Sequence, residues 1–235
     1  MTVLLVHGVR TSATMWRPEI AHLQQRGIPF LAPDLPGHGS RMDEPWSLDE
    51  AFATIDRAVR ASDGPVVLVG HSMGGLLGAM YLGTETPPPV AAFVSIGATA
   101  LPHGAGLAVY RTVFGTLRRM PNHGMAVTQT LLRATLPEEA REDWGAGGYA
   151  IQAEDDALSS LADLDFEHAL PRIAIPTWFV NGQFDQLRLN ERLFTQLVPH
   201  AELVLVPRAT HLVPSSHPRV VNAVIDLALA SVNSL

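Results

Sequence analysis

Two amino acids are missing from this chain of 235 residues, cysteine and lysine. The lack of cysteine excludes disulfide bonds, thiol nucleophiles, iron–sulfur clusters and zinc sites built on cysteine. The lack of lysine excludes Schiff-base chemistry and the lysine of phosphate-binding loops. All 16 basic residues are therefore arginines, and with 23 acidic residues the net charge is −7. A chain without a basic excess is not expected to bind nucleic acid.

Long hydrophobic runs are also lacking. Residues 1–8 are apolar but far too few for a signal peptide or a membrane span, so we expect a cytoplasmic protein without a membrane partner. No His-Glu-x-x-His or other metal-ligand spacing occurs, and neither a metal nor another cofactor is predicted. The composition, 47% hydrophobic and 17% charged, is typical of a globular protein. No pattern in the sequence specifies an oligomeric state.

Short β-branched runs alternate with longer helical patterns, which indicates an α/β fold with a mainly parallel, doubly wound sheet. The expected strands, all interpreted as fully buried, are residues 3–6, 29–32, 65–70, 90–96, 177–181 and 202–206. The helices expected with them are residues 15–26, 48–61, 73–83, 189–197 and 218–232.

The alternation stops between residues 97 and 171. Only broken helical segments are expected there, at residues 106–119, 125–134, 138–143 and 149–161. About 75 residues are too many for a structureless loop inside a compact domain. We therefore expect a helical cap at residues 97–171, inserted into a core formed by residues 1–96 and 172–235. A separate helical domain is the alternative, and the strand pattern that resumes at residues 175–181 argues against it.

Ser72 is the strongest candidate for a reactive residue. It lies in the sequence Gly-His-Ser-Met-Gly, between an expected strand and an expected helix. A tight strand-to-helix turn exposes the serine as a nucleophile, and the flanking glycines let the two backbones pass closely. The N-terminus of the helix then directs free N–H groups at the reacting centre. The alternative is a turn of small residues that serves only close packing.

A serine nucleophile needs a base, and the base needs an acid that orients it. Among ten histidines, His211 follows the last expected strand, and Asp185 follows the strand before it. Ligands of parallel sheets bind beyond the carboxyl ends of the strands, which is where both side chains are expected. The backbone N–H groups of Met73 and of Val9, beyond the first strand, are expected to bind the oxyanion of a tetrahedral intermediate.

Together these motifs resemble those of the α/β-hydrolase family. The matching pieces are His7-Gly8 with Ser12 and Trp16, the turn Asp34-Leu35-Pro36-Gly37-His38-Gly39-Ser40, the serine turn, Pro176 with Asn181-Gly182 and Asp185, and Thr210-His211. The resemblance implies a catalytic triad of Ser72, Asp185 and His211. Because the chain begins at what resembles the family's third strand, we expect about six strands without the family's N-terminal hairpin.

The function implied by the resemblance is cofactor-independent hydrolysis of small to medium hydrophobic carboxylic esters through an acyl-enzyme. A thioesterase or a lactonase with the same triad is an alternative. Two further alternatives remain on the same fold. One is a ligand-binding or receptor protein that does not hydrolyse its ligand, and the other is a synthase or lyase. Trp16 and Arg10 are expected to contact the substrate. Arg10 would meet an anionic group, and an exposed arginine at the rim of the cleft is the alternative interpretation.

Overall fold

A six-stranded sheet forms the centre of the molecule. The computed structural model describes residues 1–233 except 103–111, 113–114 and 117–118. The strands are β1 (Thr2–Val6), β2 (Phe30–Leu31), β3 (Val66–His71), β4 (Val90–Ile96), β5 (Thr177–Gly182) and β6 (Glu202–Val206). Their order is β2-β1-β3-β4-β5-β6, and every neighbouring pair is parallel. The predicted sheet of about six parallel strands is confirmed.

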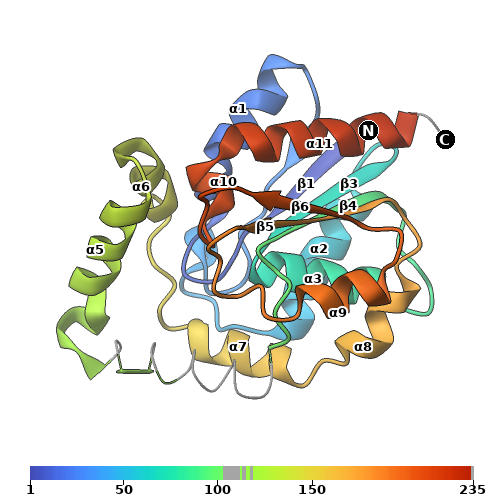
Figure 1. Ribbon diagram of the computed structural model, residues 1–235. Coiled ribbons are helices and arrows are strands. Elements are labelled where there is room, and N and C mark those ends of the chain that lie inside the picture. Colours follow the sequence, from blue (N-terminus) through green and yellow to red (C-terminus); the bar gives the residue numbers. More distant parts are fainter. Residues whose placement is uncertain (103–111, 113–114, 117–118, 234–235) are drawn as a thin grey trace.

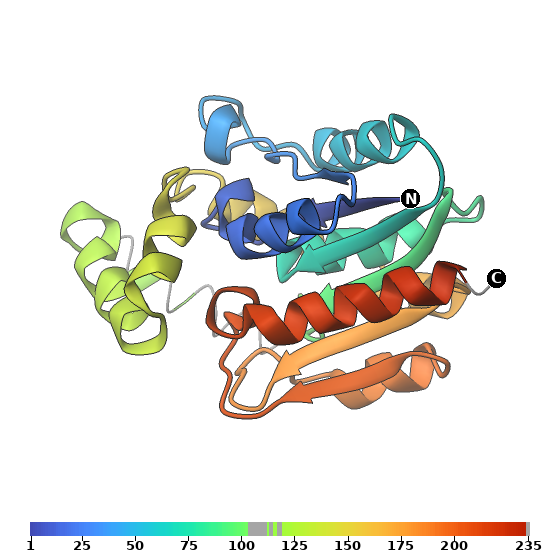
Figure 2. The same ribbon diagram turned by 90° about the horizontal axis from the view of Figure 1, so that it is seen from above.

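Helices cover both faces of this sheet (Figure 1, Figure 2). One face carries α1 (Arg17–Gln25) and α11 (Pro218–Asn233), and the other carries α2 (Leu48–Arg60), α3 (Met73–Leu82) and α9 (Glu191–Leu197). Side chains alternate between the faces along each strand, so Leu4 and Val6 belong to one hydrophobic cluster while Val3 and Leu5 belong to the other. Both faces of the central strands are therefore buried, as the continuous apolar runs predict.

The two edge strands depart from that expectation: both residues of β2 are only partly buried, and most of β6 is exposed. Leu203 and Leu205 are 43% and 44% exposed. The strand β6 lies at the edge of the sheet and pairs only with β5. The prediction that these two strands are fully buried is wrong, because an apolar run does not tell an edge strand from a central one.

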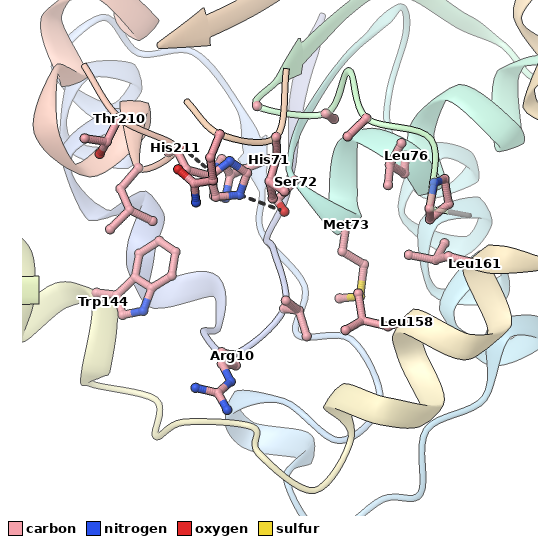
Figure 3. Close-up of a pocket in the computed structure, with 18 of the residues that line it drawn as sticks. Arg10, His71, Ser72, Met73, Leu76, Trp144, Leu158, Leu161, Thr210 and His211 are labelled. Carbon is pink, nitrogen blue, oxygen red and sulfur yellow. Dashed lines mark hydrogen bonds between the residues drawn. The ribbon is translucent and has the colours of Figure 1, made fainter. Parts of the chain in front are cut away.

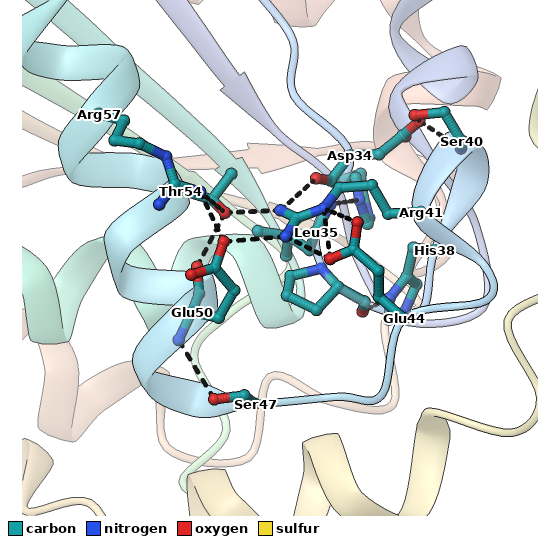
Figure 4. A network of polar contacts seen from close by, with 12 residues as sticks. Asp34, Leu35, His38, Ser40, Arg41, Glu44, Ser47, Glu50, Thr54 and Arg57 are labelled. Atoms are coloured by element: carbon teal, nitrogen blue, oxygen red, sulfur yellow. Dashed lines mark hydrogen bonds and ion pairs between the residues drawn. The ribbon is translucent and has the colours of Figure 1, made fainter.

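Polar contacts fix the loop that follows β2 (Figure 4). The Asp34 carboxylate accepts hydrogen bonds of 2.8 Å from the Ala13 N–H and from both the N–H and the hydroxyl of Ser40. Arg41 donates to Glu50 at 2.9 Å and to the Thr54 hydroxyl at 2.8 Å, both on α2. The loops after β1 and β2 are thus joined to each other and to α2.

Between β4 and β5 the structure describes helices joined by turns and irregular segments, with no strand among the described residues. The 3-10 helices are η3 (Pro121–Gly124) and η4 (Leu170–Arg172), and the α-helices include α5 (Met125–Thr135), α6 (Glu138–Gly145), α7 (Glu154–Ala162) and α8 (Phe166–Ala169). The helix expected at residues 106–119 lies largely outside the described residues. The one expected at 149–161 begins later, at Glu154, because residues 149–150 are irregular and residues 151–153 form a turn. Figure 1 shows α5 and α6 beside the sheet, whereas α8 packs on α3.

Hydrogen bonds tie α6 to the loop after β1. The Thr11 hydroxyl donates to the Trp144 carbonyl at 2.9 Å, and the Thr14 hydroxyl donates to the Asp143 carbonyl at 2.6 Å. Arg17 pairs with the Asp143 carboxylate at 2.8 Å. The helices α5 and α6 are therefore held to the molecule at the end of β1. Within the described part of the chain, no helix is long and apolar enough to cross a lipid bilayer.

Candidate active site

Ser72 occupies the sharp turn between β3 and α3. Its φ of 52° and ψ of −116° are a conformation that side chains rarely adopt, and the hydrogen bond from its N–H to the Ile96 carbonyl at 2.8 Å holds it there. A Cβ on Gly74 would lie 2.2 Å from the Val6 carbonyl oxygen, so only glycine lets α3 approach β1 this closely. The turn presents the Ser72 hydroxyl at the carboxyl edge of the sheet.

Asp185 and His211 meet Ser72 at that edge (Figure 3). The His211 Nε2 lies 3.0 Å from the Ser72 Oγ. The His211 Nδ1 lies 3.0 and 3.1 Å from the two carboxylate oxygens of Asp185. An Nδ1–H that donates to the carboxylate leaves Nε2 to accept the hydroxyl proton, which is the tautomer that a general base requires.

Hydrogen bonds between the loops after β5 and β6 hold this arrangement. The Phe184 N–H donates to the Ala209 carbonyl at 2.8 Å, and the Arg208 N–H donates to the Gln183 side-chain oxygen at 3.0 Å. Burial alone would raise the pKa of Asp185, but the neighbouring His211 and the Leu187 N–H, which donates at 2.8 Å, outweigh it. The pKa of Asp185 therefore lies below its ordinary value, and the carboxylate stays ionised to orient the imidazole.

Two further residues touch the triad, and sequence reasoning assigned neither of them a role at the site. A Cβ on Gly97, whose φ is +59°, would lie 3.1 Å from the His211 Nδ1 and 3.3 Å from an Asp185 oxygen. His71 donates from Nε2 to the His211 backbone carbonyl at 3.0 Å. Burial, together with the nearby His211, lowers the pKa of His71 to about 3, so its ring is neutral. Both contacts join residues far apart in the chain, and no local pattern signals them.

A cavity of about 400 Å³ opens beside Ser72. Val9 and Met73 both line it, and Met73 is the first residue of α3, so its N–H has no partner within the helix. The lining is mainly apolar and comes from α3, from the loops after β1, β5 and β6, and from the segment 97–171. Side chains of that segment in the lining include Leu101, Leu131, Leu132, Trp144, Leu158 and Leu161. Figure 3 shows several of them around the Ser72 hydroxyl.

The structure corrects the expectations for Trp16 and Arg10. Trp16 is completely buried in a hydrophobic cluster beside the sheet and does not line the cavity, so it is not positioned to contact a substrate. Arg10 does line the cavity, but it is 6% exposed rather than at an open rim. Glu154 binds its guanidinium through two hydrogen bonds of 2.7 and 2.8 Å, so an anionic partner is already present.

A family model described as "Alpha/beta hydrolase family" matches residues 3–224. The chain belongs to this family. Among curated members, lipase LipV of Mycobacterium tuberculosis is 33% identical over 184 residues, which are 77% of this chain and 60% of that protein. This chain therefore spans less than two thirds of LipV. The pimeloyl-[acyl-carrier protein] methyl ester esterase of Xanthomonas oryzae is 29% identical, and the match covers 98% of this chain and 95% of that one.

Solved structures of α/β hydrolases share the fold of the whole chain. A bromoperoxidase from Bacillus anthracis superposes with a TM-score of 0.81 and 20% identity, covering 97% of this chain and 91% of that one. A thermophilic esterase from Thermogutta terrifontis gives a TM-score of 0.75 and 23% identity, covering 99% and 90%. At these identities the likeness concerns the fold alone.

Proposed function

We propose that this α/β hydrolase is a carboxylic ester hydrolase with Ser72 as nucleophile, His211 as base and Asp185 as the orienting acid. The observation that carries the proposal is the continuous chain of hydrogen bonds from Asp185 through His211 to the Ser72 hydroxyl, at the wall of an apolar cavity. The names of the curated relatives, a lipase and methyl ester esterases, support the same reaction.

In the proposed reaction the Ser72 oxygen attacks the ester carbonyl while His211 Nε2 takes the hydroxyl proton. The carbonyl oxygen becomes an oxyanion, which the N–H groups of Val9 and Met73 bind. His211 then returns the proton to the leaving alcohol, and an acyl-enzyme remains on Ser72. A water molecule activated by His211 attacks this acyl group and releases the acid. Asp185 stabilises the imidazolium that forms twice in the cycle.

The proposed substrates are small to medium hydrophobic esters. A cavity of about 400 Å³ with a mainly apolar lining favours an acyl or alcohol portion without charge. Segment 97–171 acts as a cap in this proposal, since its side chains complete the walls of the cavity. Thioesters and lactones fit the same chemistry, and one solved relative is titled an enol-lactonase and another a thioesterase domain. The cytoplasmic location and the absence of a nucleic-acid partner stay predictions from the sequence.

Substitution of Ser72→Ala tests the proposal. We expect turnover of a 4-nitrophenyl ester to fall by on the order of 10⁴–10⁶, as in other triad removals. A fluorophosphonate probe should label the wild type at Ser72 and leave the variant unlabelled. Ser62→Ala, which changes a serine hydroxyl bonded to the Ala58 carbonyl on α2, serves as the matched control and should keep both properties. Near-normal turnover by Ser72→Ala would remove Ser72 from its role.

A further inference from the structure

An ion pair joins the catalytic core to α7 at the wall of the cavity. The Arg10 Nε lies 2.7 Å from Glu154 Oε1, and Nη2 lies 2.8 Å from Oε2. The Arg10 side chain is 8% exposed and that of Glu154 is completely buried. The third nitrogen, Nη1, lies 3.5 Å from the Thr128 hydroxyl on α5. The guanidinium therefore contacts α5 and α7, two of the helices that line the cavity.

Arg10 lines the cavity, so the charge of this ion pair can affect which substrates bind there. Among the described residues that line the cavity, Arg10 is the only arginine or acidic residue, and the histidines His71 and His211 belong to the Ser72 site. Arg10 follows Val9, which supplies a proposed oxyanion N–H. Its φ of 63° is uncommon for a residue with a side chain and persists only where the surroundings impose it. Figure 3 places its guanidinium on a different side of the cavity from Leu76, Leu158 and Leu161.

We propose that the Arg10–Glu154 pair sets the charge selectivity of the site, which favours neutral esters and rejects hemiesters whose far end is a carboxylate. This inference rests on the proposed ester hydrolysis. A carboxylate that enters an apolar cavity loses its hydration and needs a cation in exchange. Glu154 already binds Arg10 through a two-point contact, and its carboxylate is completely buried, so an entering carboxylate meets a guanidinium that another anion holds. A carbonyl or hydroxyl group of a neutral substrate carries no charge and needs no counter-ion in the cavity.

The proposal predicts that loss of the Glu154 charge weakens the preference for neutral esters. In Glu154→Gln, Arg10 keeps a neutral hydrogen-bond partner, but the negative charge beside its guanidinium is lost, so the potential at this wall of the cavity becomes more positive. A substrate carboxylate is then accepted more readily. Glu154→Ala removes the same charge with a smaller side chain, so the outcome does not depend on one replacement. The double variant Arg10→Gln/Glu154→Gln removes both charges and should retain the preference for neutral esters.

The experiment compares kcat/KM within two matched substrate pairs. Methyl hexanoate and monomethyl adipate differ only by a carboxylate at the end of the acyl portion. Hexyl acetate and 6-acetoxyhexanoate differ in the same way at the end of the alcohol portion. We expect the wild type to favour the neutral ester at least 10-fold in one or both pairs. We expect Glu154→Gln or Glu154→Ala to reduce that preference at least 10-fold in the same pair.

Glu44→Gln is the matched control, because it makes the same change of net charge in an exposed ion pair with Arg41. It should leave every ratio at the wild-type value. Equal rates for both members of both pairs in the wild type, which needs no variant to fold, would overturn the proposal. So would an unchanged ratio in a folded Glu154 variant. Failure of the wild type to hydrolyse any of the four esters, together with no phosphonate labelling, would instead overturn the proposed function.

Discussion

Gly97 shares the space around the His211 imidazole with Asp185. It combines a positive φ of +59° with a close approach, since a Cβ there would lie 3.1 Å from the His211 Nδ1. Any side chain at this position both strains the backbone and presses on the atom that donates to Asp185. The distance of 3.0 Å between His211 and Ser72 depends on that imidazole staying in place.

Gly97→Ala should therefore lower kcat by about 10-fold, less than the roughly 10²-fold effect of a displacement of about 1 Å, because the imidazole has to move by only a fraction of that distance. The strained φ should also lower the free energy of unfolding by about 1–2 kcal/mol. Gly27→Ala is the matched control, because Gly27 has φ +63° but no atom within 4 Å of the added Cβ. We expect it to lose similar stability and keep full activity. Equal kcat for both variants in an ester assay would argue against crowding at His211.

The outcome at individual residues shows what sequence can predict. Ser72, Asp185 and His211 each follow a strand, and parallel strands carry such residues to one edge, so their meeting was predictable. The environment of Arg10 was not predictable in this way, because its partner Glu154 lies 144 positions further along the chain. The same holds for Trp16, whose burial depends on how the loop after β1 packs against α6.

The helices α3 and α5 differ sharply in burial. Nine of the ten residues of α3 are buried, whereas Leu132 is the one buried residue of α5. A helix with few buried side chains opens at a small fraction of the global unfolding free energy. We therefore expect amides of residues 125–135 to exchange with deuterium at least about 10 times faster than those of residues 73–82. Equal protection in hydrogen-exchange mass spectrometry would contradict this.

Most elements of the core were predictable, since their apolar runs are set by burial on both faces of a sheet. Two features of the helices and strands were not predictable from the sequence. The exposure of β6 follows from the strand order, which the sequence does not state. Residues 149–153, where a helical pattern was expected, are irregular and end in a turn before α7. In a segment that packs on a loop and not on the sheet, apolar spacing gives a weaker guide to where helices begin.

The stability of the whole molecule should depend on buried histidines. Burial, aided by a neighbouring histidine ring, lowers the pKa of both His7 and His71 to about 3. Between about pH 6.5 and 3 the unfolded chain binds a proton at each of these positions that the folded protein does not. Each therefore reduces the free energy of unfolding by about 1.4 kcal/mol per pH unit as the pH falls. Burial also raises the pKa of Glu19, so this one carboxyl group increases the free energy of unfolding as the pH falls. It therefore offsets part of the effect of the two histidines.

We expect urea unfolding to report a steep loss of stability below about pH 6.5. His71→Gln, which keeps a donor for the His211 carbonyl, should remove one histidine's share of that loss, about 1.4 kcal/mol per pH unit. His168→Gln replaces an exposed histidine and is the control that should leave the slope unchanged. Identical slopes for the wild type and His71→Gln would show that His71 is not buried in its neutral form.

The attachment of α6 and α7 to residues 10–17 has a consequence for engineering. A chimera that imports the insert of another hydrolase would graft it onto a strand connection shaped for Trp144, Asp143 and Glu154. The donor's own version of residues 10–17 would have to be transplanted with it. That stretch immediately follows Val9, so a swap intended to alter ligand preference also rebuilds the backbone next to the reacting carbonyl.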